Sequence, residues 1–179
     1  IRYNVVEGGP TGNNSDLIGI DQIDVYNNIV ANFDDCAGAT DINSVFGGAV
    51  GTTNNIGPFD NSTATTDGSD PVAGWECFGE PDGSGSAPEL NNTVWFTFTG
   101  DGNNYFVESG NCAGVTNYID DGDTQFALYT GSCGNLTPVK CNEDGPNATS
   151  NTYPAGFSFS TTVGTQYYLM VDGFSLSGA

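Results

Sequence analysis

The sequence contains no histidine and only two basic residues, Arg2 and Lys140, against 22 acidic ones, so its formal net charge is −20. Without histidine, the chain cannot build a Ser-His-Asp or Cys-His catalytic site or offer an imidazole to a metal. Two cations cannot follow a phosphate backbone, and anionic membranes repel a surface of this charge. These absences argue against nucleic-acid binding and leave only chemistry based on carboxylates or on metals with oxygen ligands.

Long hydrophobic runs and helical periodicity are also scarce. No stretch approaches the roughly 18 consecutive apolar residues of a membrane-spanning helix, so we expect no membrane insertion. The best helical segment is short, covering 41–46 after a candidate cap at Thr40. The chain begins at Ile1 with no signal peptide, so we expect a processed chain or a segment of a longer one.

Short segments of alternating apolar and polar residues are common instead. In 93–99, Val94, Phe96 and Phe98 face one way, while Trp95 faces the other way among threonines. Clusters of Gly, Asn, Asp or Pro bound each segment, as is typical of strands joined by turns. The pattern predicts an all-β, antiparallel sandwich. The expected strands are 93–99, 105–108, 124–130, 157–160 and 166–172, with 124–130 and 138–141 paired as a hairpin.

The first 32 residues have a different organisation. Two strand-like segments, 1–6 and 18–26, flank a Gly-rich loop, and two strands alone are only marginally stable in water. We therefore interpret 1–32 as the terminal strands of a preceding β domain or as a linker hairpin. The main domain is expected to occupy 33–179, including a long Gly/Ser/Pro loop at 76–90.

The sequence has five cysteines: Cys36, Cys77, Cys112, Cys133 and Cys141. Gly134 and Asn135 lie between the last two, which favours a disulfide Cys133–Cys141 across a closed hairpin. A second disulfide, Cys77–Cys112, would tie the long loop to the end of strand 105–108. A zinc site is the alternative, but no CxxC pair and no histidine support it. Disulfides favour an oxidising, extracellular location.

Carboxylates gather at the open end of the expected hairpin. Hard oxygen ligands in this number suit Ca²⁺ better than Mg²⁺, although a solvated acidic turn has the same composition. The predicted ligands are Asp120, Asp121, Asp123, Asn142, Glu143 and Asp144. A second, weaker cluster comprises Glu76, Glu80 and Asp82 in the long loop.

We predict no catalytic residues, because no feature of the sequence would raise the pKa of one member of a carboxylate pair, as a glycosidase requires. Two tryptophans are candidates for stacking on sugars. Trp75, near the long loop, is the predicted glycan contact, whereas Trp95 lies in an alternating strand and is expected in the core.

Four segments follow one pattern in order and spacing: NTVWFTF (92–98), DTQFALYTGSCG (123–134), CNED (141–144) and GTQYYLMVDGF (164–174). The pattern resembles the pre-peptidase C-terminal-like β-sandwich domains of large secreted and surface proteins of marine Bacteroidota-type bacteria. The resemblance covers roughly 33–179. Residues 1–26 look like the closing strands of a jelly-roll domain placed before it.

This resemblance implies a non-catalytic sandwich that serves as a repeat module in giant adhesins or as an accessory domain on secreted hydrolases. The family pattern continues beyond Phe174 into one further strand that carries a cysteine. Cys36 is therefore unpaired within this chain and is expected to bond to a cysteine downstream of Ala179. The edge at 166–171 would then be exposed, to be covered by the following segment or by a neighbouring copy in a fibre.

Together these expectations describe an extracellular structural or adhesive module of a multidomain surface or filament protein, stabilised by Ca²⁺ and disulfides. The alternative is a carbohydrate-binding accessory domain of a secreted hydrolase. The expected partners are neighbouring domains of the same polypeptide, further copies in a homo-oligomer or fibre, and cell-surface glycans.

Overall fold

The computed structural model describes residues 33–57, 59, 61, 63–71, 90, 92–110, 124–146 and 154–173. The chain divides into two units, 1–30 and 31–179, and the described residues all belong to the second. The hairpin interpreted within 1–32 and most of the loop at 76–90 lie outside the described residues. Among the described residues, no helix is long and apolar enough to cross a membrane.

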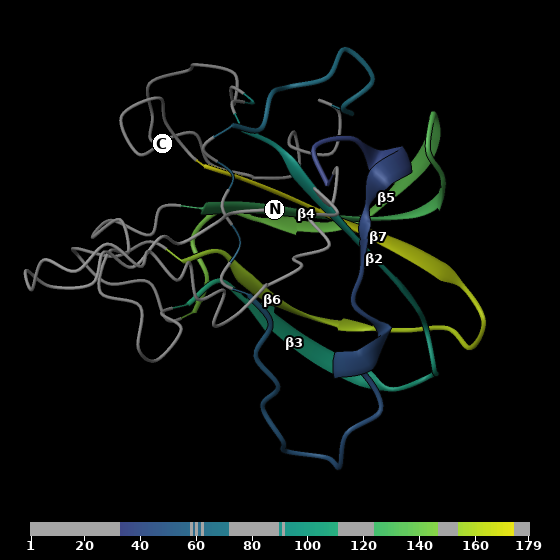
Figure 1. Ribbon diagram of the computed structural model, residues 1–179. Helices are drawn as coiled ribbons and strands as arrows, with labels where there is room; N and C mark the ends of the chain where they lie inside the picture. Colours follow the sequence, from purple (N-terminus) through teal and green to yellow (C-terminus); the bar gives the residue numbers. More distant parts are fainter. Residues whose placement is uncertain are drawn as a thin grey trace, which may run out of the picture. The chain divides into compact units, whose positions relative to one another are not determined.

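The described part of the chain folds into two β-sheets, which confirms the predicted all-β sandwich (Figure 1). The larger sheet has the strand order β1-β2-β7-β4-β5 and the smaller one pairs β3 with β6. All pairings are antiparallel except that of β1 with β2. The strands are β1 (Thr40–Asp41), β2 (Val94–Thr99), β3 (Asn104–Glu108), β4 (Thr124–Ser132), β5 (Asn135–Asn142), β6 (Gly156–Ser160) and β7 (Gln166–Gly173).

The prediction of a short helix at 41–46 is wrong. Two 3-10 turns, η1 (Cys36–Gly38) and η2 (Asn43–Val45), lie on either side of β1. The Asp41 carboxylate accepts a hydrogen bond from the backbone N–H of Asn43 at 2.7 Å, and Ile42 N–H donates to Thr97 O at 2.9 Å. The Ile42 bond continues the pairing of β1 with β2. The N–H groups of Val45 and Phe46 then donate to carbonyls three residues earlier, so the chain forms a single 3-10 turn here and not an α-helix.

The predicted alternation is confirmed on β2, β4 and β7. Side chains such as Phe96, Phe98 and Leu169 pack in the core between the sheets. Strands β3 and β6 lie beneath the larger sheet in Figure 1. The Phe98 ring lies 5.8 Å from Phe159 of β6, measured between ring centroids. The buried core between the sheets contains Ile42, Ala64, Val94, Phe96, Phe98, Phe126, Leu128, Ala155, Phe157, Phe159, Tyr167 and Leu169.

A second buried cluster covers the opposite, outer face of the larger sheet. It consists of Trp95, Ala127, Tyr129 and Met170, each no more than 1% exposed. Trp95 is therefore a core residue, as expected, but on the face that points away from the smaller sheet. Its indole N–H donates to the buried carboxylate of Asp70 at 3.1 Å. Burial raises the pKa of Tyr129, and the negative charge of Asp70 raises it further.

The position of β7 contradicts the expected open edge at 166–171. Strand β7 pairs with β2 along 166–171 and with β4 from Tyr167 to Gly173, so it lies inside the sheet. The expectation failed because strand order is set by long-range pairing, which neighbouring segments of sequence do not specify.

Lys140 joins the edges of the two sheets. It lies on β5, and its ammonium donates to the backbone carbonyl of Ser158 on β6 at 2.7 Å. The same ammonium lies 5.7 Å from the centroid of the Phe157 ring. A lysine on an edge strand also discourages pairing with a foreign strand. The one basic residue in the described part of the chain thus links edge strand β5 of the larger sheet to β6 of the smaller sheet.

Asp101 stabilises the turn between β2 and β3 through hydrogen bonds. Its carboxylate accepts hydrogen bonds from the Tyr105 hydroxyl at 2.6 Å and from Asn103 N–H at 3.0 Å. A further bond from the Thr161 hydroxyl, at 3.2 Å, ties this turn to the end of β6. The Tyr105 hydroxyl, followed by Asn103 N–H, holds the pKa of Asp101 at about 2.

This arrangement predicts an acid-dependent loss of stability. A folded-state pKa of about 2, below the ordinary value of 3.8 for an aspartate, means that Asp101 stabilises the fold above pH 4. That contribution is lost as the pH falls from about 4 to 2. We expect urea unfolding of Asp101→Asn to show lower stability at pH 7 and a shallower decline between pH 4 and 2. Asp144→Asn, a change at an exposed carboxylate elsewhere, is the control, and identical declines in all three proteins would contradict the prediction.

Candidate functional site

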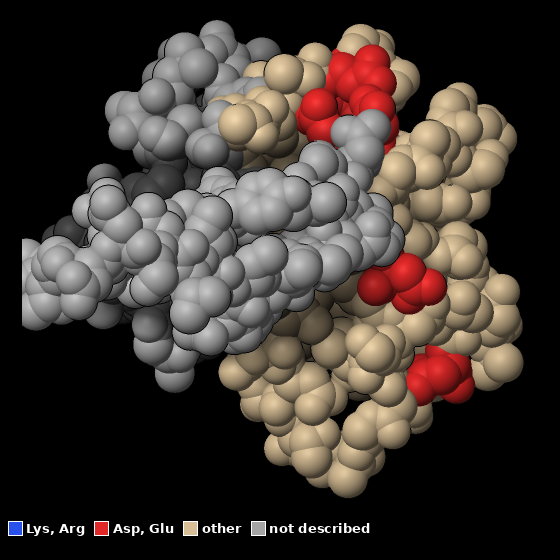
Figure 2. All heavy atoms as spheres, in the orientation of Figure 1, with Lys and Arg blue, Asp and Glu red and all other residues tan. Residues whose placement is uncertain are grey.

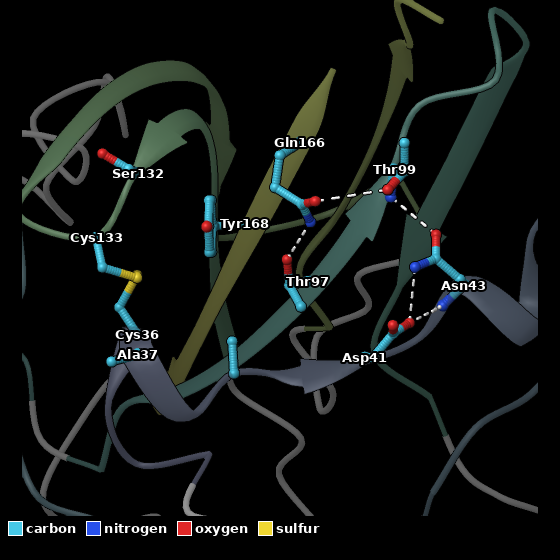
Figure 3. A pocket seen from close by; sticks show the side chains of 11 residues that line it. Cys36, Ala37, Asp41, Asn43, Thr97, Thr99, Ser132, Cys133, Gln166 and Tyr168 are labelled. Atoms are coloured by element: carbon cyan, nitrogen blue, oxygen red, sulfur yellow. Dashed lines mark hydrogen bonds between the residues drawn. A yellow bond between two sulfur atoms is a disulfide. The ribbon is translucent and has the colours of Figure 1, made fainter. Parts of the chain in front are cut away.

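A groove of about 570 Å³ lies on the outer face of the larger sheet, a volume within the range of small-ligand pockets. Figure 3 shows the Cys36–Cys133 disulfide at one end and Asp41 with Asn43 at the other, with Gln166, Thr97 and Tyr168 between them. The lining residues are Cys36, Ala37, Ala39, Asp41, Asn43, Thr97, Thr99, Ser132, Cys133, Gln166 and Tyr168.

The floor of the groove is held by hydrogen bonds between β2 and β7. The Gln166 amide donates to the hydroxyl of Thr97 and, at 3.0 Å, to the backbone carbonyl of Phe98. The Thr97 hydroxyl in turn donates to the Tyr167 carbonyl at 3.0 Å. The polar groups of the floor are therefore fixed before any ligand arrives.

Asp41 and Asn43 form one end of the groove. The Asn43 side-chain oxygen accepts from Thr99 N–H at 2.8 Å, and its amide N–H donates to Asp41 Oδ1 at 2.8 Å. The second carboxylate oxygen, Asp41 Oδ2, accepts no hydrogen bond from a described residue, and Asp41 is exposed. An acceptor is thus presented to solvent at a fixed position.

The other end of the groove corrects the predicted disulfides. Cys36 and Cys133 are bonded to each other, with their Cα atoms 5.7 Å apart, so the pair Cys133–Cys141 and the unpaired Cys36 are both wrong. Cys141 is also disulfide-bonded, although not to Cys133. The other predicted pair, Cys77–Cys112, lies outside the described residues.

The position of the hairpin turn explains the error. Ser132 pairs with Asn135, so Cys133 and Gly134 form the turn itself, and Gly134 adopts the φ of +83° that the turn requires. Cys141 lies far along β5, opposite Ala127. A strand rises about 3.3 Å per residue, which places Cys133 more than about 20 Å from Cys141, well beyond the roughly 7 Å limit for a disulfide.

Tyr168 supplies the aromatic surface of the groove. It is half-buried on β7, opposite Thr97 of β2, and packs against the outer cluster around Trp95. Its hydroxyl makes no hydrogen bond to a described residue. One part of the ring is therefore anchored, and the rest is available to a ligand.

None of the described residues that line the groove is basic. Lys140 is the only basic residue in the described part of the chain, and it donates to Ser158 at the corner of the sandwich. Figure 2 shows acidic side chains in separate patches, and no basic one, on the described part of the face in view. The site can therefore recognise hydroxyls, amides or cations, whereas an anion would find no counter-charge.

The predicted calcium ligands are only partly described. Pairing of Phe126 with Asn142 confirms the hairpin and places 142–144 beside the start of β4. Asn142 uses its side-chain oxygen to accept Gly156 N–H at 3.0 Å, and Asp144 is exposed. Among the described residues, no three Asp, Glu, Cys or His side chains gather into a metal site. The remaining predicted residues, Asp120, Asp121, Asp123, Glu76, Glu80, Asp82 and Trp75, lie outside the described residues.

Two features of this face were missed by sequence reasoning. The groove combines side chains from four separate segments, 36–43, 97–99, 132–133 and 166–168. Its one visible signal in the sequence was the polar outer row of Thr97, Thr99 and Gln166. Asp70 is buried, 7% exposed, and accepts hydrogen bonds from Thr93 at 2.6 Å as well as from Trp95. A lone Asp in a turn segment carries no pattern that would predict this role.

Comparison with known proteins identifies no relative: no family model, no curated protein and no solved structure matches the chain. The resemblance to pre-peptidase C-terminal-like domains stays a prediction that rests on the four sequence segments.

The observed disulfide makes a stability prediction. In the chain-entropy model, a crosslink across a loop of this size, 97 residues in sequence, restricts the unfolded chain strongly. We expect the double variant Cys36→Ser/Cys133→Ser to lose about 2–4 kcal/mol of unfolding free energy in urea. Non-reducing peptide mapping of the native protein should join the peptides of Cys36 and Cys133. A peptide joining Cys133 to Cys141 would contradict the structure.

Proposed function

We propose that this chain is an extracellular structural and adhesive β-sandwich module of a large multidomain bacterial surface or filament protein. The observation that carries the proposal is the disulfide between Cys36 and Cys133, which links segments 97 residues apart. Disulfides persist in oxidising compartments and are rare in reducing ones. The net charge of −20 supports the same setting, because high ionic strength or bound cations relieve the repulsion.

We propose further that the module acts by binding and not by catalysis. The described residues that line the groove include a single carboxylate, Asp41, among hydroxyls, amides and small apolar side chains. Glycoside hydrolysis commonly uses two carboxylates facing one bond, and acyl transfer needs an activated nucleophile. This composition supports a role in holding a ligand in place.

A carbohydrate-binding accessory domain of a secreted hydrolase is the second candidate. The specific observation that favours it is the groove itself, with Tyr168 on its floor and fixed polar groups beside the ring. The two candidates differ in what surrounds the module in the intact protein: repeated copies of the same four segments, or a catalytic domain.

The first test is exposure on cells. Antibodies raised against residues 31–179 should label intact, non-permeabilised cells that produce the protein, and external protease should remove the signal. A cytoplasmic protein of the same cells, probed in parallel, controls for lysis. Labelling that appears only after permeabilisation would contradict the proposed location.

Calcium is the second testable part of the proposal. A metal that binds only the native state stabilises it by about 2.7 kcal/mol at one hundred times its dissociation constant. At moderate salt, a chelator should therefore lower the melting temperature of the native protein, and Asp123→Asn should remove most of the difference. Asp101→Asn, which alters a turn carboxylate elsewhere, should keep the full calcium effect. An unchanged melting curve after chelation would contradict the calcium proposal and would favour the interpretation of the acidic segment as a solvated turn.

A further inference from the structure

We propose that the groove that runs from the Cys36–Cys133 disulfide to Asp41 and Asn43 binds a short, neutral oligosaccharide, with Tyr168 as the stacking surface. The inference names the ligand class of the adhesive role and rests on that proposed function for its biological meaning. The site differs from the glycan contact predicted at Trp75, because it is built from other residues on the outer face of the larger sheet.

The first argument is preorganisation. Gln166, Thr97 and Asn43 are fixed by hydrogen bonds to neighbouring strands, so a ligand need not order them. The disulfide fixes the opposite end of the groove by joining η1 to the hairpin turn. Binding loses less conformational entropy when the groups that contact the ligand are already held in place.

The second argument is the chemistry of the groups that remain available. Asp41 Oδ2 and the hydroxyls of Ser132 and Tyr168 make no hydrogen bond to a described residue. Sugar hydroxyls both donate and accept, so they match a mixed set of carboxylate and hydroxyl partners. The apolar face of a sugar ring matches the part of Tyr168 that the outer cluster does not cover.

The third argument is charge. Among the described residues, Asp41 is the only charged one that lines the groove, so the site would disfavour sulfated or uronic sugars. A cationic peptide is the competing ligand class. An exposed ion pair with one carboxylate contributes little, whereas the aromatic ring and the row of hydroxyls and amides provide most of the contact surface. The lining therefore favours a neutral ligand.

The experiment measures binding to the full chain by titration calorimetry and ligand-observed NMR. The probes are neutral gluco-, manno- and galacto-oligosaccharides of two to four units, their sulfated counterparts, and a short lysine-rich peptide. We expect at least one neutral probe to bind with a dissociation constant in the micromolar to low-millimolar range, independent of salt. The sulfated counterpart should bind at least about tenfold more weakly.

Three variants locate the binding. Tyr168→Ala should weaken it by at least about tenfold, and Tyr168→Phe, which keeps the ring, by only a few-fold. Because Tyr168 also packs on the outer cluster, Ala37→Trp provides a second test: Ala37 is exposed, and the larger side chain would fill the groove without altering its floor. Phe106→Ala is the matched control, since Phe106 is a 47% exposed aromatic on the smaller sheet.

Loss of binding in Tyr168→Ala and Ala37→Trp, with binding kept in Phe106→Ala, would support the proposal. It is overturned if no neutral probe binds, or if Ala37→Trp binds like the native chain. It is equally overturned if only the lysine-rich peptide binds, in a salt-dependent way that Asp41→Asn abolishes. Labelling of intact cells does not depend on the groove, so failure here is distinguishable from failure of the proposed function.

Discussion

The register of β7 between β2 and β4 is the constraint on which the other features depend. Leu169 lies opposite Phe96 on one side and Leu128 on the other, and all three face the smaller sheet. The next residue, Met170, lies between Trp95 and Ala127 on the opposite face. Because side chains alternate with a period of two, a shift of one residue in β7 would exchange these two faces. The same register places Tyr168 and Gln166 on the outer face, where the groove forms.

The outer face changes character along its strands. Near Trp95 the outer face is buried, and Asp70 accepts hydrogen bonds from the Trp95 indole N–H and the Thr93 hydroxyl. Toward Thr99 and Gln166 it becomes polar and open, and the segment from η1 to η2 lines only its margin. Buried carboxylates are tolerated only when they are paired or hydrogen-bonded, and Asp70 meets this condition with neutral donors. Among the described residues, the donors to this carboxylate are the neutral groups of Asp67 N–H, Thr93 and Trp95.

Local patterns predicted what local physics determines. Alternation identified the strands and their faces, because a half-buried strand must place its apolar side chains every second residue. The order of the strands and the partner of Cys36 depend on segments far apart in the sequence, and each of these predictions was wrong or absent. The groove belongs to the same class, since Asp41, Ser132 and Gln166 meet only after the sheet has formed. The spacing of the cysteines led to the wrong disulfide, because a bond between Cys133 and Cys141 would require the turn to lie midway between them.

The crosslink between Cys36 and Cys133 also has a mechanical consequence. The 97 residues that it spans would reach about 320–350 Å if pulled straight, at about 3.3–3.6 Å per residue. Tension applied to the chain on the two sides of this bond passes instead between two Cα atoms 5.7 Å apart. Strands β2, β3 and β4 lie within the spanned segment and are shielded from extension, while β7 lies outside it but is clamped between β2 and β4. To unravel β7, tension would have to break two ladders at once, so under tension the sandwich behaves as a short, stiff link.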